Sequence, residues 1–163
     1  MSFEDLRDLY QDVIMEHGRH PRHGTRLQAF DATAKGDNPM CGDRVQIWLK
    51  FSPDHTIEDA GFEARGCAIS IASADLMAEA VRGQSKAGTK ALFAAFREMV
   101  QSGDFPACAP AVAAPLAQLK PLSGVHEYPS RVKCATLAWH ALNAALDVAP
   151  GDVPGEIMES SGE

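Results

Sequence analysis

The chain has 163 residues, of which 45% are hydrophobic and 23% are charged, and its formal net charge is −7. This length suits one domain with a single core and is too short for two domains of ordinary size. No apolar run reaches the roughly 18 residues of a membrane span. No basic stripe of the kind that binds nucleic acid is present. We therefore expect neither a membrane nor a nucleic acid as partner.

The two ends of the sequence predict where the chain works and which part of it is folded. The first eight residues are charged and lack the apolar core of a signal peptide, so we expect a cytoplasmic protein. From Asp147 onward there are five acids and no Lys or Arg, among Gly, Pro and Ser. This composition predicts an acidic, disordered tail over residues 149–163. In a cytoplasmic chain, four cysteines favour metal ligands, reactive thiols or core residues over disulfides.

Residues 3–17 carry apolar side chains at helical spacing and precede Gly18, which predicts a first amphipathic helix. The loop that follows adds His20 and His23 to His17 at the helix end. These histidines indicate either a metal or docking site or a solvated, weakly basic turn. We favour the solvated turn, because no cysteine lies nearby in sequence.

Residues 44–51 alternate between apolar and polar side chains, which predicts a β-strand. Residues 56–64 predict a second strand, and a shorter one around 29–35 completes a small three-stranded antiparallel sheet. Strands followed by helices indicate an α+β fold, a single domain over residues 1–148 with helices on one face of the sheet. Helical patterns cover residues 69–81, 86–101 and 130–148, whereas 102–128 predict an irregular insertion with one short helix near 111–119.

Residues 36–43 place Cys41 and Asp43 two positions apart within a run of turn-forming residues. In extended backbone, side chains at i and i+2 face the same side, so this thiol and carboxylate can close on one metal ion. Gly36, Asn38–Pro39 and Gly42 favour a loop with unusual backbone angles here.

Two further cysteines are predicted at the starts of helices, Cys67 after the second strand and Cys134 in the first turn of the last helix. Unpaired N–H groups at a helix start favour a thiolate. Three thiols and the carboxylate of Asp43 suit a tetrahedral zinc site, in which the carboxylate is a weaker, replaceable ligand. Simple packing is the alternative for each cysteine. Cys108, between Ala and Pro, has no such setting and is interpreted as a bystander.

Four stretches of the chain resemble the IscU/SufU family of iron–sulfur cluster assembly proteins. The resemblance implies a SufE/IscU-like α+β fold and a metal site formed by Cys41, Asp43, Cys67 and Cys134. It also points to Arg131 as a polar neighbour that steadies the negative charge of the site. The stretches are Leu9–His17, Gly36–Asp43, Phe62–Ser70 and Arg131–Trp139.

Two departures from the IscU pattern favour the SufU branch. Lys133 stands where IscU-type scaffolds have His, and Glu127–Arg131 does not reproduce their Leu-Pro-Pro-Val-Lys motif. The resemblance then implies a zinc-dependent sulfurtransferase. Cys41 would accept persulfide sulfur from a PLP-dependent cysteine desulfurase of the SufS type and pass it to a downstream scaffold or thiol acceptor. A scaffold holding a transient Fe–S cluster on the same ligands and a purely structural zinc domain are the alternatives.

Overall fold

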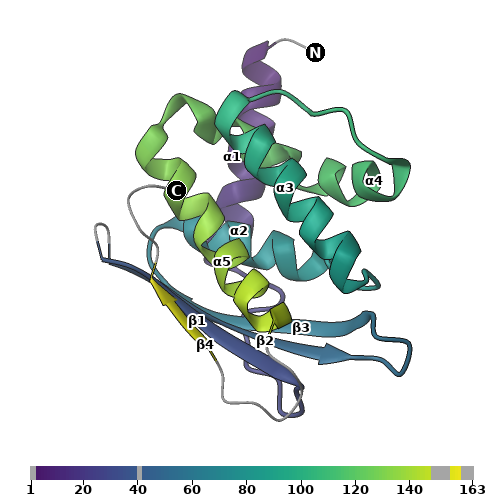
Figure 1. Ribbon diagram of the computed structural model, residues 1–163. Coiled ribbons are helices and arrows are strands. Elements are labelled where there is room, and N and C mark those ends of the chain that lie inside the picture. Colours follow the sequence, from purple (N-terminus) through teal and green to yellow (C-terminus); the bar gives the residue numbers. More distant parts are fainter. Residues whose placement is uncertain (1–2, 40–41, 148–154, 159–163) are drawn as a thin grey trace.

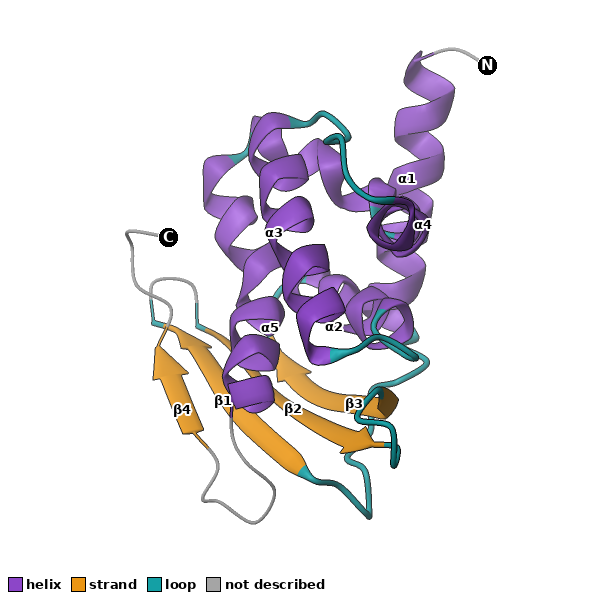
Figure 2. Ribbon diagram, turned by 45° about the vertical axis from the view of Figure 1, so that its right-hand side comes forward, coloured by secondary structure: helices purple, strands orange, loops and turns teal. Residues whose placement is uncertain are grey.

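The computed structural model of this protein describes residues 3–39, 42–147 and 155–158. A layer of helices covers one face of a sheet, so the predicted α+β fold is confirmed (Figures 1 and 2). Within these residues, no helix is both long and apolar enough to span a membrane. The elements, in chain order, are α1 (Phe3–Arg19), β1 (Ala32–Asn38), β2 (Asp43–Phe51), β3 (Ile57–Arg65), α2 (Ala68–Ala80), α3 (Lys86–Ser102), α4 (Pro110–Gln118), the 3-10 helix η1 (Lys120–Glu127), α5 (Pro129–Asp147) and β4 (Gly155–Met158).

The sheet contains the three predicted antiparallel strands, with β2 between β1 and β3. Along β2, the side chains of Val45, Ile47 and Leu49 are buried on the helix-covered face. The polar residues between them point to the other face, as does Trp48, which is buried there. This alternation is the period of two on which the strand prediction rests. The central strand therefore separates an apolar interior from a polar outer surface.

The strand β1 begins and ends later than the predicted strand over 29–35, and it includes Gly36, Asp37 and Asn38. These turn-forming residues are extended because each pairs with a residue of β2, up to Asn38 opposite Asp43. Gly36 is also where α5 approaches the sheet: a Cβ there would lie 3.2 Å from the Cδ1 atom of Leu137. The predicted loop is therefore shorter than expected, although Gly42 has the positive φ of 77° that a tight link requires.

The acidic tail is not wholly disordered, which corrects the prediction for residues 155–158. These residues form β4, which pairs in parallel with β1 at its outer edge, from Ala34 opposite Gly155 to Asp37 opposite Met158. Figure 2 shows β4 beside β1. An open strand edge offers unpaired backbone groups, and β4 satisfies those of β1. The remaining tail residues, 148–154 and 159–163, lie outside the described residues.

Two helices place the polar site at one end of the sheet. The helix α2 packs against α1, α5 and β3, and nine of its residues are buried. The helix α5 crosses β1 and β2 (Figure 1). A helix apolar on all sides is expected at the centre of a core. The first turn of α2 and the N-terminal part of α5 therefore meet where β2 begins and β3 ends.

The insertion at 102–128 is more regular than predicted. The expected short helix is present as α4, but residues 120–127 form η1 rather than irregular chain. The reason is burial, because Leu116, Leu119, Leu122 and Val125 join the main core and bind the segment to the other helices. Local Pro and Gly content indicated a loop, and tertiary packing overrides that preference.

Candidate metal centre

Asp43 is a buried carboxylate, and one of its oxygens has no partner in the described part of the chain. It is the first residue of β2, and only 1% of its surface is exposed. Its Oδ1 atom accepts a hydrogen bond of 3.1 Å from the backbone N–H of Cys67. Its Oδ2 atom is buried and has no hydrogen-bond partner among the residues that the structure describes. Because an unsatisfied buried carboxylate oxygen is costly, this atom calls for a ligand such as a cation.

Gly66 makes room for that carboxylate. Its φ of 150° lies in a region that residues with a side chain rarely adopt, and a Cβ at this position would lie 2.7 Å from the Cγ atom of Asp43. Glycine is therefore required between β3 and α2 for the chain to turn against Asp43 and to present the N–H of Cys67 to it.

The two thiols come from different helices, and one of the two predictions about their position is wrong. Cys67 is the N-cap residue of α2, as predicted. Cys134 does not lie in the first turn of α5, because that helix already begins at Pro129. Ligand atoms of Asp43, Cys67 and Cys134 nevertheless all lie within 4.8 Å of one another. The fold thus brings together three residues separated by up to 91 positions in sequence.

The two thiols ionise very differently. The hydrogen bond from the Cys134 thiol, aided by the backbone amides of Ser70 and Ile69, lowers the pKa of Cys67 to about 6, against the opposing effects of burial and of Asp43. The same hydrogen bond, with burial and the nearby Asp43, raises the pKa of Cys134. Cys67 is therefore the first thiolate to form, and Cys134 keeps its proton until a cation displaces it.

Arg131 lies on the exposed side of this cluster. Hydrogen bonding to Cys134 and the charge of Cys67 raise the pKa of its guanidinium. Its role as the polar neighbour that the resemblance implied stays a prediction. Cys41, by contrast, lies outside the described residues. Cys108 is half-buried in the chain before α4 and is not part of the cluster.

The donor atoms fit a zinc ion. Two thiols and one carboxylate are ligands that Zn²⁺ accepts in tetrahedral sites, where a fourth protein ligand or an exchangeable group completes the coordination. The unpartnered Oδ2 atom of Asp43 and the close approach at Gly66 both suit an ion held between β2 and α2. Asp43, Cys67 and Cys134 would hold it, with the fourth position open to a residue such as Cys41.

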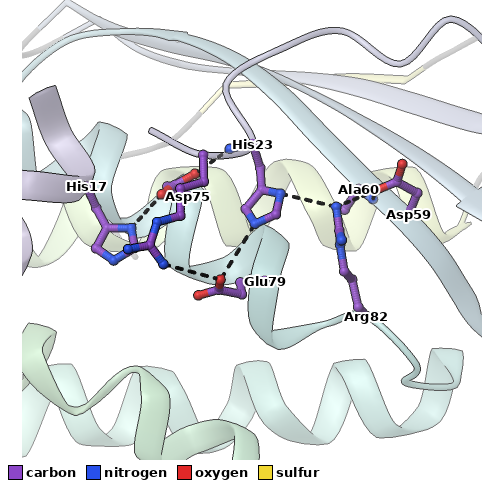
Figure 3. A network of polar contacts seen from close by, with 8 residues as sticks. His17, His23, Asp59, Ala60, Asp75, Glu79 and Arg82 are labelled. Atoms are coloured by element: carbon purple, nitrogen blue, oxygen red, sulfur yellow. Dashed lines mark hydrogen bonds and ion pairs between the residues drawn. The ribbon is translucent and has the colours of Figure 1, made fainter. Parts of the chain in front are cut away.

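The histidine cluster is not a solvated turn, which corrects that interpretation for two of its members. His17 is buried, and its Nδ1 atom lies 2.5 Å from Oδ2 of Asp75 (Figure 3). The backbone N–H of His23 donates to Oδ1 of the same carboxylate at 2.8 Å. The His23 ring lies between Arg82, at 3.1 Å, and Glu79, at 3.8 Å. His20 is exposed, as expected of a turn.

Sequence reasoning missed Asp75 altogether. It is fully buried in α2 and joins that helix to the end of α1 and to the chain that follows. A signal was available, because Asp75 is an acid in the middle of an otherwise small and apolar helix face. A charged residue in such a position is expected to have a partner.

Comparisons with known proteins agree with this architecture. The sequence pattern of the NifU-like N-terminal domain matches residues 9–135. The chain is 40% identical over 146 residues to the iron–sulfur cluster assembly scaffold protein IscU of Streptococcus pyogenes serotype M1, a match that covers 90% of this chain and 87% of the relative. It is 37% identical over 147 residues to the zinc-dependent sulfurtransferase SufU of Bacillus subtilis strain 168, covering 90% and 95%, respectively.

A solved structure extends the agreement to three dimensions. The crystal structure of a proposed iron–sulfur cluster assembly scaffold for the SUF system of Fervidobacterium islandicum AW-1 superposes with a TM-score of 0.74 at 28% identity. That match covers 86% of this chain and 98% of the other. The protein therefore belongs to the NifU-like N-terminal domain family and stands at similar identity to its IscU and SufU members.

Proposed function

We propose that this protein is a zinc-dependent sulfurtransferase of iron–sulfur cluster assembly, which accepts persulfide sulfur from a cysteine desulfurase. The observation that carries the proposal is the buried, unpartnered carboxylate oxygen of Asp43 beside the thiols of Cys67 and Cys134. A carboxylate among thiolates gives a site whose ligands exchange more readily than those of an all-cysteine site. The similarity to the zinc-dependent sulfurtransferase of Bacillus subtilis supports the same conclusion.

Cys41 is the residue that we assign as sulfur acceptor. When bound, a zinc ion keeps thiols deprotonated at neutral pH and orders the site. The Cys41 thiolate attacks the terminal sulfur of the desulfurase persulfide, so that a new S–S bond forms on Cys41. The original S–S bond breaks, and its electron pair leaves on the desulfurase cysteine. This exchange conserves oxidation state and needs no added oxidant or reductant.

The other site residues act on charge and position. Cys67 is the thiol with the lowered pKa, and its N–H holds one oxygen of Asp43 in place. Arg131 is exposed at the rim of the cluster and offsets the negative charge that thiolates and a persulfide accumulate there. These roles prepare the site for an anionic donor without requiring that the fold rearrange.

A second function, the assembly of an Fe–S cluster on the same residues, is favoured by a specific observation. The relative from Streptococcus pyogenes is a scaffold protein, and it is 40% identical over 90% of this chain. Cysteine thiolates are the usual ligands of such clusters, and one oxygen ligand would make the cluster labile. Metal content separates the two functions, because a scaffold yields iron and acid-labile sulfide on anaerobic reconstitution.

The test combines metal analysis with desulfurase turnover. We expect about one zinc ion per chain and a strong increase in cysteine turnover by a SufS-type desulfurase when the protein is added. The variant Cys41→Ala should lose both the increase and the gain of one sulfur atom in its mass. Cys108→Ala, a cysteine outside the cluster, is the matched control and should keep both. Sulfur uptake by the Cys41→Ala variant would overturn the assignment of the acceptor.

A further inference from the structure

The outer face of the sheet, which the helices leave open, contains a groove of about 620 Å³. It lies over one end of β1, β2 and β3 and is lined by side chains that alternate with the buried ones of the core. Its charged and polar lining residues, which we call the cationic groove, are Lys35, Asp37, Arg44, Gln46, Glu63 and Arg65.

Two arginines face each other across this groove. Arg44 and Arg65 are direct partners in the register of β2 and β3, so their side chains leave the same face of the sheet. Side chains directly opposite each other on antiparallel strands have Cβ atoms about 4.5–5.5 Å apart, and like charges in such a pair are destabilising. The fold therefore maintains an unfavourable pair of charges at this position.

The sheet itself offsets this charge only in part. The Nε atom of Arg44 lies 3.3 Å from Oδ1 of Asp37, and both side chains are exposed, so the pair contributes little to stability. Arg65 has no ion pair among the residues that the structure describes. A guanidinium is a rigid fork suited to carboxylates, and that of Arg65 is available to an external anion.

The cationic groove is adjacent to the metal centre in sequence and lies behind it in space. Arg44 follows Asp43 directly, and Arg65 precedes Cys67 by two residues, but their side chains leave opposite faces of the sheet. Both arginines therefore lie at the same end of the sheet as Asp43, the end that a sulfur-delivering partner approaches. The whole chain carries a net charge of −7. The three basic and two acidic side chains that line the groove leave it with a net charge of +1, so it is a local exception to a repulsive field for an acidic partner.

We propose that the cationic groove is a docking surface for an acidic segment of the sulfur-donating cysteine desulfurase. Carboxylates of that segment lie between Arg44 and Arg65 and relieve the repulsion between them. This inference rests on the proposed function, because it takes the desulfurase as the partner. Charges at the rim of an interface affect the orientation and rate of association more than the rate of the chemical step. The groove therefore governs the concentration needed for turnover and not the maximal rate.

The test is charge reversal by Arg65→Glu. A glutamate opposite Arg44 forms a favourable cross-strand pair, so this variant is expected to fold and to melt at or above the wild-type temperature. With a SufS-type desulfurase, its half-saturating concentration should rise at least about tenfold, with the maximal turnover unchanged. The control is Lys50→Glu, which makes the same charge change on the neighbouring strand β2, at the opposite end of the sheet, where Lys50 pairs with Glu58 at 3.2 Å. It should stay within about twofold of wild type.

Titration calorimetry measures binding to the desulfurase independently of turnover, so it tests the docking surface separately from the proposed sulfurtransferase function. Raising NaCl should weaken wild-type binding steeply and Arg65→Glu binding less. Equal half-saturation for wild type and Arg65→Glu overturns the docking surface, as does a wild-type protein that fails to bind the desulfurase. Binding of the wild type without any increase in turnover overturns the proposed function and leaves the docking surface supported.

Discussion

Two buried aspartates in this small domain have opposite surroundings. Asp75 is 0% exposed, and both of its oxygens are bonded, one to the ring of His17 and one to the backbone N–H of His23. Asp43 is 1% exposed, yet within residues 3–39, 42–147 and 155–158 only one of its oxygens accepts a hydrogen bond. The two carboxylates are equally buried, but they differ in how many of their oxygens accept hydrogen bonds.

This difference separates a structural carboxylate from one prepared for a ligand. Asp75 joins α2 to the end of α1 and to the loop after it, so its bonds are used to hold the fold together. Asp43 faces the thiols of Cys67 and Cys134, and its free oxygen gains a partner only when a cation is bound. Burial alone does not tell a structural carboxylate from a ligand-binding one, whereas the hydrogen bonds of its two oxygens do.

The largest expected effect is on folding, at Asp75. Replacing Asp75 with Ala leaves the ring of His17 and the N–H of His23 buried without an acceptor. Breaking a buried pair in this way costs about 3–5 kcal/mol of unfolding free energy. Urea denaturation of the metal-loaded protein measures this loss. Asp75→Asn, which keeps an acceptor, should lose less, and the folded fraction of both variants should bind zinc as wild type does.

The comparison fails if Asp75→Ala is as stable as wild type, or if it loses zinc while remaining folded. The first result would show that the buried His17–Asp75 contact contributes little to stability. The second would place Asp75 in the metal centre. Either outcome would remove the distinction between the two carboxylates.

The next largest effect is on metal affinity, at Asp43. Substituting a group that only supports a metal ligand typically lowers metal affinity 10–100-fold. Asp43→Ala removes a ligand itself, so zinc affinity should fall by at least about 100-fold, or about 2.7 kcal/mol. Competition with a chelator of known affinity measures it. The unfolding free energy of the metal-free protein should change little, because the variant also removes an unsatisfied oxygen. A metal-free variant far less stable than wild type would show that Asp43 is structural.

A smaller effect is expected at Gly66, which tests the position of Asp43 and not its charge. In Gly66→Ala the new Cβ would meet the carboxyl carbon of Asp43 at 2.7 Å, so the carboxylate must move away from the thiols. Zinc affinity should fall by about 10-fold, the lower end of the range for a misplaced ligand. Gly83→Ala is the matched control, with a φ of 82° and no atom within 4 Å of the new Cβ. An equal loss in both variants would assign the effect to backbone strain alone.

The sequence predicts most of the fold because its strongest patterns are local. The alternation in β2 follows from side chains that face either the core or the outer groove. Cys67 was placed at a helix start because Gly66 separates a strand pattern from a helix pattern. Cys134 was placed in the first turn of the last helix because that helix was predicted to begin at residue 130. It begins at Pro129, a favourable first helical residue, and Cys134 lies beyond its first turn.

The remaining errors concern contacts between distant residues. The bond between His17 and Asp75 spans 58 positions, and nothing in the local sequence of either residue indicates the other. The pairing of β4 with β1 is similar, because an acidic Gly- and Pro-containing segment becomes a strand only where an open edge is offered. The metal centre could be anticipated from residue types, but the missing partner of Asp43 Oδ2 becomes visible only in three dimensions.

A further expected effect is the pH dependence of the metal-free protein, which tests the charge that Asp43 meets. The pKa of Cys67 is about 6 in the folded protein, below its ordinary value of 9.0. Between these values the unfolded chain binds the extra proton, so Cys67 makes the protein more stable as the pH rises from about 6 to about 9. At higher pH the raised pKa of Cys134 acts in the opposite direction. In the presence of a chelator, the melting temperature should therefore rise over this window and fall above it. Cys67→Ser should remove the rise, and an unchanged slope in that variant would show that Asp43 faces no thiolate in the metal-free protein.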